Sequence, residues 1–230
     1  MNTRILATLA TAGALVSTAT INAQEIEVSA TAGFESEYIF RGVQIADESI
    51  QASIEGTYGD GYFGLWANES IEDYDRNASE YDLYAGWGYA IDDTFTADFG
   101  ATVYYYPDAE GDDSTFEAYA GISADVELAP SLYVYYDFDL EVLTLEASVS
   151  KSYKVDEKSS IELGAGIGYA EEDSSDFSYA YYSFNADYVY TFQDNLTASI
   201  GVRASGNDLD EVYTVKGDNI WGGVSFSYGF

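Results

Sequence analysis

Acidic side chains occupy alternate positions along many segments of this 230-residue chain, interleaved with aromatic and aliphatic residues. If each segment is a strand, the acids of one parity share one face of a sheet. Two arginines, Arg41 and Arg203, have the same parity. The acids predicted on this face are Glu35, Glu55, Asp82, Asp98, Glu117, Asp125, Glu146, Glu162 and Asp187. Carboxylates around a narrow aqueous passage favour cations, because low-dielectric walls focus their potential on the permeant ion.

The amino-acid composition gives little support for enzymatic catalysis. The chain contains no cysteine and no histidine, so thiol chemistry and a histidine base are both excluded. Metal ligation would have to rest on carboxylates alone. The acidic loop 108–113 could bind Ca²⁺ or Mg²⁺ loosely, but it lacks EF-hand spacing. We therefore predict no catalytic residue, no dedicated metal site and no cofactor.

The net charge of −33 also excludes nucleic acid as a partner, because such a surface repels phosphates. The acidity has a second explanation, adaptation to a saline habitat, which requires no ligand.

Twelve strand-like segments carry these residues, so we predict an all-β chain. Most are about 9–12 residues long, the length that a tilted membrane-spanning strand requires. Two of them, 61–68 and 131–138, carry bulky residues on both faces and are ambiguous. The segments are 27–38, 49–58, 61–68, 80–89, 94–106, 114–125, 131–138, 142–153, 159–169, 178–191, 196–205 and 219–230.

The last segment defines the fold most sharply. Val224, Phe226, Tyr228 and Phe230 alternate with small or polar residues, and the chain ends on an aromatic side chain. This pattern is typical of outer-membrane barrels, whose last strand presents a lipid face and pairs with the first. We expect a single antiparallel transmembrane β-barrel of about twelve strands, with ten or fourteen as alternatives. The competing interpretation is an edge strand of a secreted sandwich.

The connections between segments alternate in length. Those on one side, 39–48, 69–79, 107–113, 139–141, 170–177 and 206–218, are on average longer and more acidic. Those on the other side, 59–60, 90–93, 126–130, 154–158 and 192–195, are short. Long outer loops and short periplasmic turns are expected of an outer-membrane barrel. An even number of strands then puts both termini in the periplasm.

The first 23 residues have one early cation, Arg4, and then an uncharged run of apolar and small residues. This indicates a cleaved signal peptide over 1–23 and a mature barrel over 24–230. No later segment approaches the roughly 20 apolar residues of a spanning helix. The predicted location is the outer membrane of a Gram-negative bacterium.

Aromatic residues divide into two predicted sets. One set forms interfacial girdles near strand ends: Tyr38, Phe40, Tyr58, Tyr89, Phe95, Tyr105, Phe116, Tyr169, Tyr188 and Tyr190. The other set lines the interior, where it could narrow a pore or stack on a flat solute: Tyr84, Tyr104, Tyr106, Tyr119 and Tyr135.

Arg41 lies at the top of the predicted first strand. It is either a constriction or gating residue, paired with a carboxylate such as Glu37 or Asp82, or a buried structural arginine that ties the first loop to the wall. The same two alternatives apply to Arg203.

The block Tyr38-x-Phe40-Arg41-Gly42, within residues 36–44, resembles the opening signature of the TorF family of proteobacterial outer-membrane porins. Further similar blocks are 61–68, 80–87 and 103–107, and the second half matches only as barrel pattern. The resemblance implies a porin-type barrel and transfers no substrate or catalytic residue.

Two functions follow as alternatives. The first is a porin-like channel for small cationic or neutral solutes. The second is a non-conducting surface barrel whose acidic loops bind divalent cations, lipopolysaccharide or a partner. In both, we expect contact with outer-membrane lipid and lipopolysaccharide, and recognition of the C-terminal strand by the assembly machinery.

Overall fold

The computed structural model describes residues 26–71, 79–107, 109, 113–175, 177–209 and 217–230. The predicted signal peptide lies outside these residues. The strands are β1 (Glu27–Glu35), β2 (Tyr38–Phe40), β3 (Val43–Ala46), β4 (Ser49–Tyr58), β5 (Gly61–Ser70), β6 (Glu80–Ala90), β7 (Phe95–Tyr105), β8 (Ser114–Ala124), β9 (Ser131–Asp137), β10 (Val142–Lys154), β11 (Ser159–Glu172), β12 (Ser178–Gln193), β13 (Leu196–Asn207) and β14 (Asp218–Gly229). Within the described part of the chain, no helix has the length and apolar character needed to cross a membrane.

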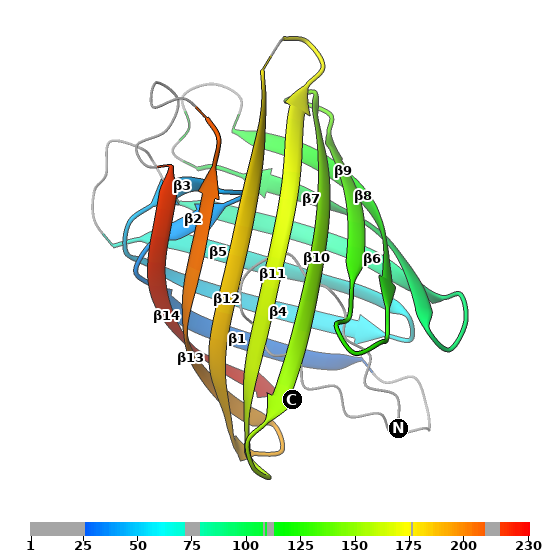
Figure 1. Ribbon diagram of the computed structural model, residues 1–230, viewed down its shortest axis with the longest axis vertical. Coiled ribbons are helices and arrows are strands. Elements are labelled where there is room, and N and C mark those ends of the chain that lie inside the picture. The colour runs from blue at the N-terminus through cyan, green and yellow to red at the C-terminus, as the bar shows by residue number, and fades with distance from the viewer. Residues whose placement is uncertain (1–25, 72–78, 108, 110–112, 176, 210–216) are drawn as a thin grey trace.

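Twelve of these strands form one closed antiparallel barrel, in the order β1-β14-β13-β12-β11-β10-β9-β8-β7-β6-β5-β4 (Figure 1). The first and last strands close it, with pairs that run from Ser29 opposite Gly229 to Glu35 opposite Gly223. The predicted fold and strand number are therefore confirmed. Closure leaves the barrel wall without a free edge, which is the condition for a sheet to cross a bilayer.

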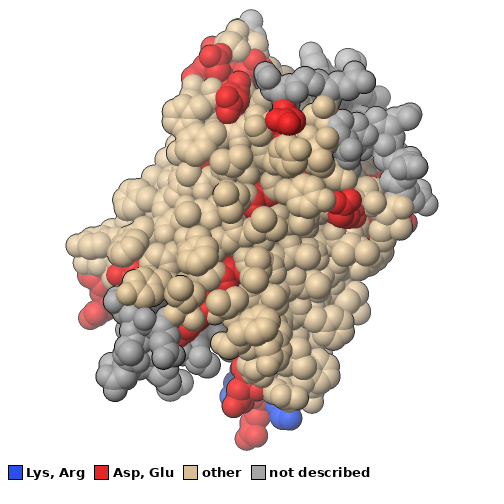
Figure 2. Space-filling view, turned by 180° about the vertical axis from the view of Figure 1, so that it is seen from behind, with Lys and Arg blue, Asp and Glu red and all other residues tan. Residues whose placement is uncertain are grey.

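Alternation along each strand produces two different faces. On β7, the outward side chains of Phe95, Phe99 and Val103 are 43%, 53% and 39% exposed, whereas the inward Asp98 and Thr102 are 4% and 1% exposed. The outer wall is accordingly apolar over most of the face in Figure 2, and its acidic residues gather mainly toward the two ends. The lumen is polar. This inverted distribution is the one that a lipid-facing barrel requires.

The two ambiguous segments also have a defined inward face. On β5, Tyr62 and Asn68 are buried in the lumen while Phe63 and Leu65 are exposed. On β9, the buried inward residues are Tyr133, Tyr135 and Asp137. Bulky residues on both faces fit here because the inward ones have partners inside the barrel: Tyr62 and Tyr133 donate to Asp98, and Trp66 packs against Tyr38.

The two ends of the barrel differ as predicted. β1, β5, β7, β9, β11 and β13 finish at one end of the barrel, which we call the long-loop end. Connections 59–60, 91–94, 125–130, 155–158 and 194–195 lie at the other, the short-turn end. Phe230 also lies at the short-turn end, where its backbone N–H donates to Val28 (2.9 Å).

One connection differs from the prediction. The first strand ends at Glu35, not at 38, and residues 38–46 form a separate two-stranded hairpin, β2–β3, in place of an open loop. Arg41 (φ 47°) and Gly42 (φ 80°) are its two turn residues, between the paired Phe40 and Val43. Positive φ at both positions is the geometry of a type I′ turn. The hairpin is the short blue pair of arrows in Figure 1, toward the long-loop end.

Glycines on the lumen face make room for the inward tyrosines. A Cβ on Gly100 would collide with the ring of Tyr119, and one on Gly121 would collide with that of Tyr133. Gly168 covers Tyr181 in the same way, so the glycine-rich stretch 164–168 is a packing surface, as its position on a strand indicated. Each such pair lets a ring lie against the neighbouring strand.

Candidate functional site: the lumen and its inserted hairpin

The lumen wall holds nearly all the side chains predicted for it. Glu35, Glu55, Asp82, Asp98, Glu117, Asp187 and Arg203 are buried on the inner face, and Glu146 and Glu162 lie there partly buried. Asp125 was wrongly placed on this wall. β8 ends at Ala124, and Asp125 belongs to the exposed turn 125–130 at the short-turn end. The chain leaves the sheet there, so strand parity no longer applies.

The predicted interior tyrosines also lie in the lumen. Tyr84, Tyr104, Tyr119 and Tyr135 are buried, and Tyr106 is partly so. Two girdle predictions were wrong, because Tyr38 and Phe40 belong to the hairpin. Tyr38 is 5% exposed, and its cluster with Ala46 includes Phe40, Ile45 and Trp66 of β5. The other girdle residues lie outward at strand ends, although Tyr190 is only partly exposed.

Arg41 joins the tip of the hairpin to the wall. Its Nη1 and Nη2 donate to Oε2 and Oε1 of Glu117 on β8, at 2.7 and 2.9 Å. The guanidinium also lies 4.5 Å from the ring centroid of Tyr135 and 4.8 Å from that of Phe40. A bidentate fork between two aromatic faces is the strongest arrangement available to an arginine. The predicted partners, Glu37 and Asp82, were therefore wrong: the acid that Arg41 contacts is Glu117.

Two further side-chain bonds fix the hairpin inside. Tyr38 Oη donates to Glu80 Oε2 of β6 at 2.9 Å. Asn207 Nδ2 of β13 donates to the carbonyl of Gly42 at 2.5 Å. The hairpin thus crosses the lumen, with its base against β5 and β6 and its tip against β8 and β13.

Arg203 is bonded within the wall itself. Its Nη2 lies 2.9 Å from Asp187 Oδ1 on β12 and 3.4 Å from Glu35 Oε1 on β1. Asn185 donates to the other oxygen of Asp187 at 2.9 Å. This cluster spans neighbouring strands β12, β13, β14 and β1, since Trp221 of β14 also bonds Glu35. It lines the lumen without crossing it.

Tyrosine hydroxyls satisfy the carboxylates nearer the short-turn end. Tyr84 donates to Glu55 at 2.9 Å, and both Tyr62 and Tyr133 donate to Asp98, at 2.9 and 3.2 Å. Tyr62 also bonds Tyr119 through its hydroxyl. These hydrogen bonds hold the acids against the wall.

Several lumen residues were not predicted. Glu80 (3% exposed) and Asp137 (5% exposed) are buried acids, and Tyr62, Tyr133 and Tyr181 are buried tyrosines of the inner face. Glu80 has the inward parity of Asp82, so the same rule identifies it. The hairpin also had a signal, because apolar residues flank Gly42 on both sides, at Ile39 and Phe40 and again at Val43 and Ile45.

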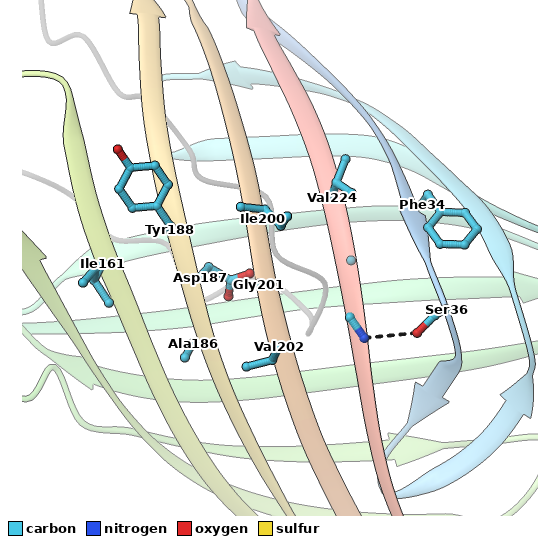
Figure 3. Close-up of a pocket in the computed structure, with 12 residues that line it drawn as sticks. Phe34, Ser36, Ile161, Ala186, Asp187, Tyr188, Ile200, Gly201, Val202 and Val224 are labelled. Atoms are coloured by element: carbon cyan, nitrogen blue, oxygen red, sulfur yellow. Dashed lines mark hydrogen bonds between the residues drawn. The ribbon is translucent and has the colours of Figure 1, made fainter.

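A depression of about 610 Å³ marks the outer wall where β1 leaves the sheet. Figure 3 shows apolar side chains around it, among them Phe34, Tyr188, Ile200 and Val224, with the small Ala186 between them. Ser36 makes the last contact with β14, since its Oγ accepts from the N–H of Gly222 at 3.1 Å. Most of its lining lies on the outer face of the wall, and Asp187 of the Arg203 cluster is also among the lining residues.

Comparison with solved structures places the fold among outer-membrane channels. The KdgM porin gives a TM-score of 0.59 at 16% identity, covering 88% of this chain and 99% of that one. The COG4313 outer membrane channel from Pseudomonas putida F1 gives 0.59 at 10% identity, covering 92% and 97%. The NanC porin gives 0.55 at 11% identity, covering 87% and 98%. The chain is thus a twelve-strand barrel of the porin type.

A family model for Gcw_chp, described as a bacterial protein of unknown function, matches residues 19–219. The chain belongs to this family. The description does not carry the TorF name, which stays a resemblance. A search of curated proteins gave no match.

Proposed function

We propose that this protein is a porin-like channel of the outer membrane, through which small cationic or neutral solutes diffuse. The proposal includes no catalytic activity. Both termini would lie in the periplasm, with the long-loop end outside the cell. The C-terminal strand, with Val224, Phe226, Tyr228 and Phe230 exposed or lipid-facing, would be the segment that the assembly machinery recognises.

The charge of the lumen carries this proposal. The inward acids are Glu35, Glu55, Glu80, Asp82, Asp98, Glu117, Asp137, Glu146, Glu162 and Asp187. The cations of the described residues that lie against these acids are Arg41 and Arg203, while Lys154 has inward parity but is exposed at the short-turn end of β10. Both arginines are already paired with acids. The acids that are ionised would make the potential inside the barrel negative, and the low-dielectric wall would focus that potential on whatever enters.

Planar-bilayer recording tests both parts of the proposal. Purified, folded protein should give discrete conductance steps, and a salt gradient should give a reversal potential on the cation-selective side. Protein that inserts as a folded barrel and gives no steps would reject the channel. A reversal potential at zero or on the anion side would reject the acidic lumen as the selectivity element.

The second candidate is a non-conducting surface barrel. The observation in its favour is the β2–β3 hairpin, which crosses the lumen and bonds to its far wall. The acidic long loops would then be the functional surface, for divalent cations, lipopolysaccharide or a partner. No group of three or more potential metal ligands occurs in the described residues. Channel recordings separate the two candidates.

A further inference from the structure

We propose that the β2–β3 hairpin is the gate of the channel, held closed by the Arg41–Glu117 pair at its tip. The gate rests on the proposed channel function and adds to it the element that regulates passage. In the closed state the hairpin lies across the lumen, as in this structure. In the open state the tip leaves its seat on β8 and β13 and swings toward the long-loop end.

The backbone of the hairpin is independent of the barrel wall. β2 and β3 pair only with each other. No backbone–backbone hydrogen bond joins residues 38–47 to a wall strand in the described part of the chain; bonds on either side of the hairpin are those of Ser36 with Gly222 and of Ile71 with Glu48. A two-stranded hairpin alone is marginally stable in water, so side-chain contacts with the wall must hold it in place.

Those contacts differ between the base and the tip. At the base, Tyr38 and Ala46 (5% and 2% exposed) pack against Trp66, with the rings of Tyr38 and Trp66 5.4 Å apart. At the tip, the hydrogen bonds to the wall are the Arg41–Glu117 fork and the Asn207 bond to Gly42, and the ring contacts are those of Arg41 with Tyr135 and of Phe40 with Tyr104. Polar contacts thus make up a larger share at the tip than at the base. Water can replace polar contacts far more readily than it can replace buried apolar surface. The base is therefore the pivot and the tip is the latch.

The seat of the tip admits only a residue without a side chain. A Cβ on Gly42 would lie 2.7 Å from Tyr181 Cβ and 3.0 Å from the carbonyl oxygen of Gly206. Alanine at position 42 can thus be accommodated only if the tip moves away from β12 and β13. Gly42→Ala is expected to favour the open state without removing any polar partner.

Thiol modification measures the opening without relying on conductance. The chain has no cysteine, so a single introduced one is a clean probe. Thr102 of β7 is 1% exposed and pairs directly with Glu117, so Thr102→Cys should react slowly with a charged, water-soluble thiol reagent. Adding Arg41→Ala should speed this reaction roughly tenfold to a hundredfold, the range expected for loss of a charge-assisted bidentate bond. Arg41→Lys should give an intermediate rate.

Two control variants make equivalent substitutions at positions outside the lumen. Lys151→Ala removes an ion pair of the same 2.7 Å length, to Glu127. Gly59→Ala places a Cβ on another positive-φ glycine (63°), in the turn between β4 and β5. Neither should change the reaction rate at position 102.

Bilayer recordings of the same variants complete the test. Gly42→Ala and Arg41→Ala should raise the mean current several-fold over wild type, while Gly59→Ala and Lys151→Ala should not. If channels appear but neither current nor reaction rate changes with the latch, the hairpin is a fixed constriction and the gate is rejected, while the channel stands. If no folded variant conducts, the channel itself is rejected and the gate with it.

Discussion

Two arginines lie in the same acidic lumen, and their bonding differs in kind. Arg41 forms two hydrogen bonds of good geometry with one acid, Glu117, and lies between two rings. Arg203 approaches two acids, Asp187 and Glu35, and its Nη1 makes no hydrogen bond to any described residue. The arginine with the better geometry is the one that joins a separate element to the wall.

This difference follows from what else holds each residue. Arg203 belongs to β13, whose ladder bonds to β12 and β14 fix its position whether or not the side chain is paired. Arg41 belongs to a turn that has no ladder bond to the wall. The Arg203 ion pair adds to the stability of the sheet without determining the position of any element, whereas the Arg41 ion pair determines where the hairpin lies. Three pairs of substitutions test this difference, each with one change at Arg41 or its partner and one at Arg203 or its partner. The Lys151–Glu127 ion pair is a further comparison.

The acid partners should show the largest effect. Glu117→Gln leaves the Arg41 guanidinium without a counter-charge, a change that costs about 3–5 kcal/mol for a buried pair. The hairpin can avoid this cost by moving into water, so we expect a raised channel current with little change in Tm. Asp187→Asn should lower Tm and leave the current close to wild type, because Glu35 remains beside Arg203.

Current in planar bilayers and Tm by circular dichroism measure the two responses. If Glu117→Gln lowers Tm by as much as Asp187→Asn does and leaves the current unchanged, the proposed difference between Arg41 and Arg203 is wrong. Both arginines would then be structural parts of the wall.

Replacing each arginine with lysine should have a smaller effect. Lysine keeps the charge but cannot form the bidentate fork. At position 41 we expect the closed state to lose about 0.5–1.5 kcal/mol, the size of one hydrogen bond, which is less than in Arg41→Ala. At position 203, where the existing contacts are not a fork, the change in stability should be below about 0.5 kcal/mol.

The thiol-reaction rate of Thr102→Cys measures how much Arg41→Lys weakens the closed state, and the Tm of the barrel measures how much Arg203→Lys lowers stability. Equal effects at the two positions would show that the fork geometry of Arg41 is not what holds the hairpin.

Strand parity predicted the barrel and most of its lumen from the sequence. Period-two alternation separates Asp98 from Phe99 and Glu117 from Phe116, because one face must be apolar against lipid and the other is free to be polar. Asp125 was misplaced because parity gives the face of a residue but not the point at which its strand ends.

The path of the hairpin could not be predicted in this way. Strand pairing relates residues on neighbouring strands of the wall. Arg41 and Glu117 are 76 residues apart and meet inside the barrel, so no pairing pattern links them. Apolar residues beside Gly42 indicate a turn with structure of its own. They do not indicate that the turn points inward, which depends on the combined surface offered by β5, β6, β8 and β13.

Ion selectivity should respond weakly to both arginines. Arg41→Ala and Arg203→Ala each remove one positive charge from the lumen and leave its acids in place, so both should shift the reversal potential toward stronger cation preference. The shift should be small because each guanidinium is already neutralised by an acid within about 3 Å. A shift toward anions in either variant would contradict the placement of its carboxylate partner in the conducting path.

The smallest effect is expected at Lys151 and Glu127, which lie 2.7 Å apart on the exposed side of the wall. The hydrogen bond from Lys151 and its charge hold the pKa of Glu127 below its ordinary value. Any stability from this pair is present above the ordinary carboxyl pKa and is lost as the pH falls through the lowered value. Exposed pairs contribute little because water and salt screen them. Lys151→Ala should therefore lower Tm only slightly at neutral pH and leave current and reversal potential unchanged, and the small difference in Tm should vanish in acid. A large effect would show that the length of an ion pair, and not the element that it holds, determines its importance in this barrel.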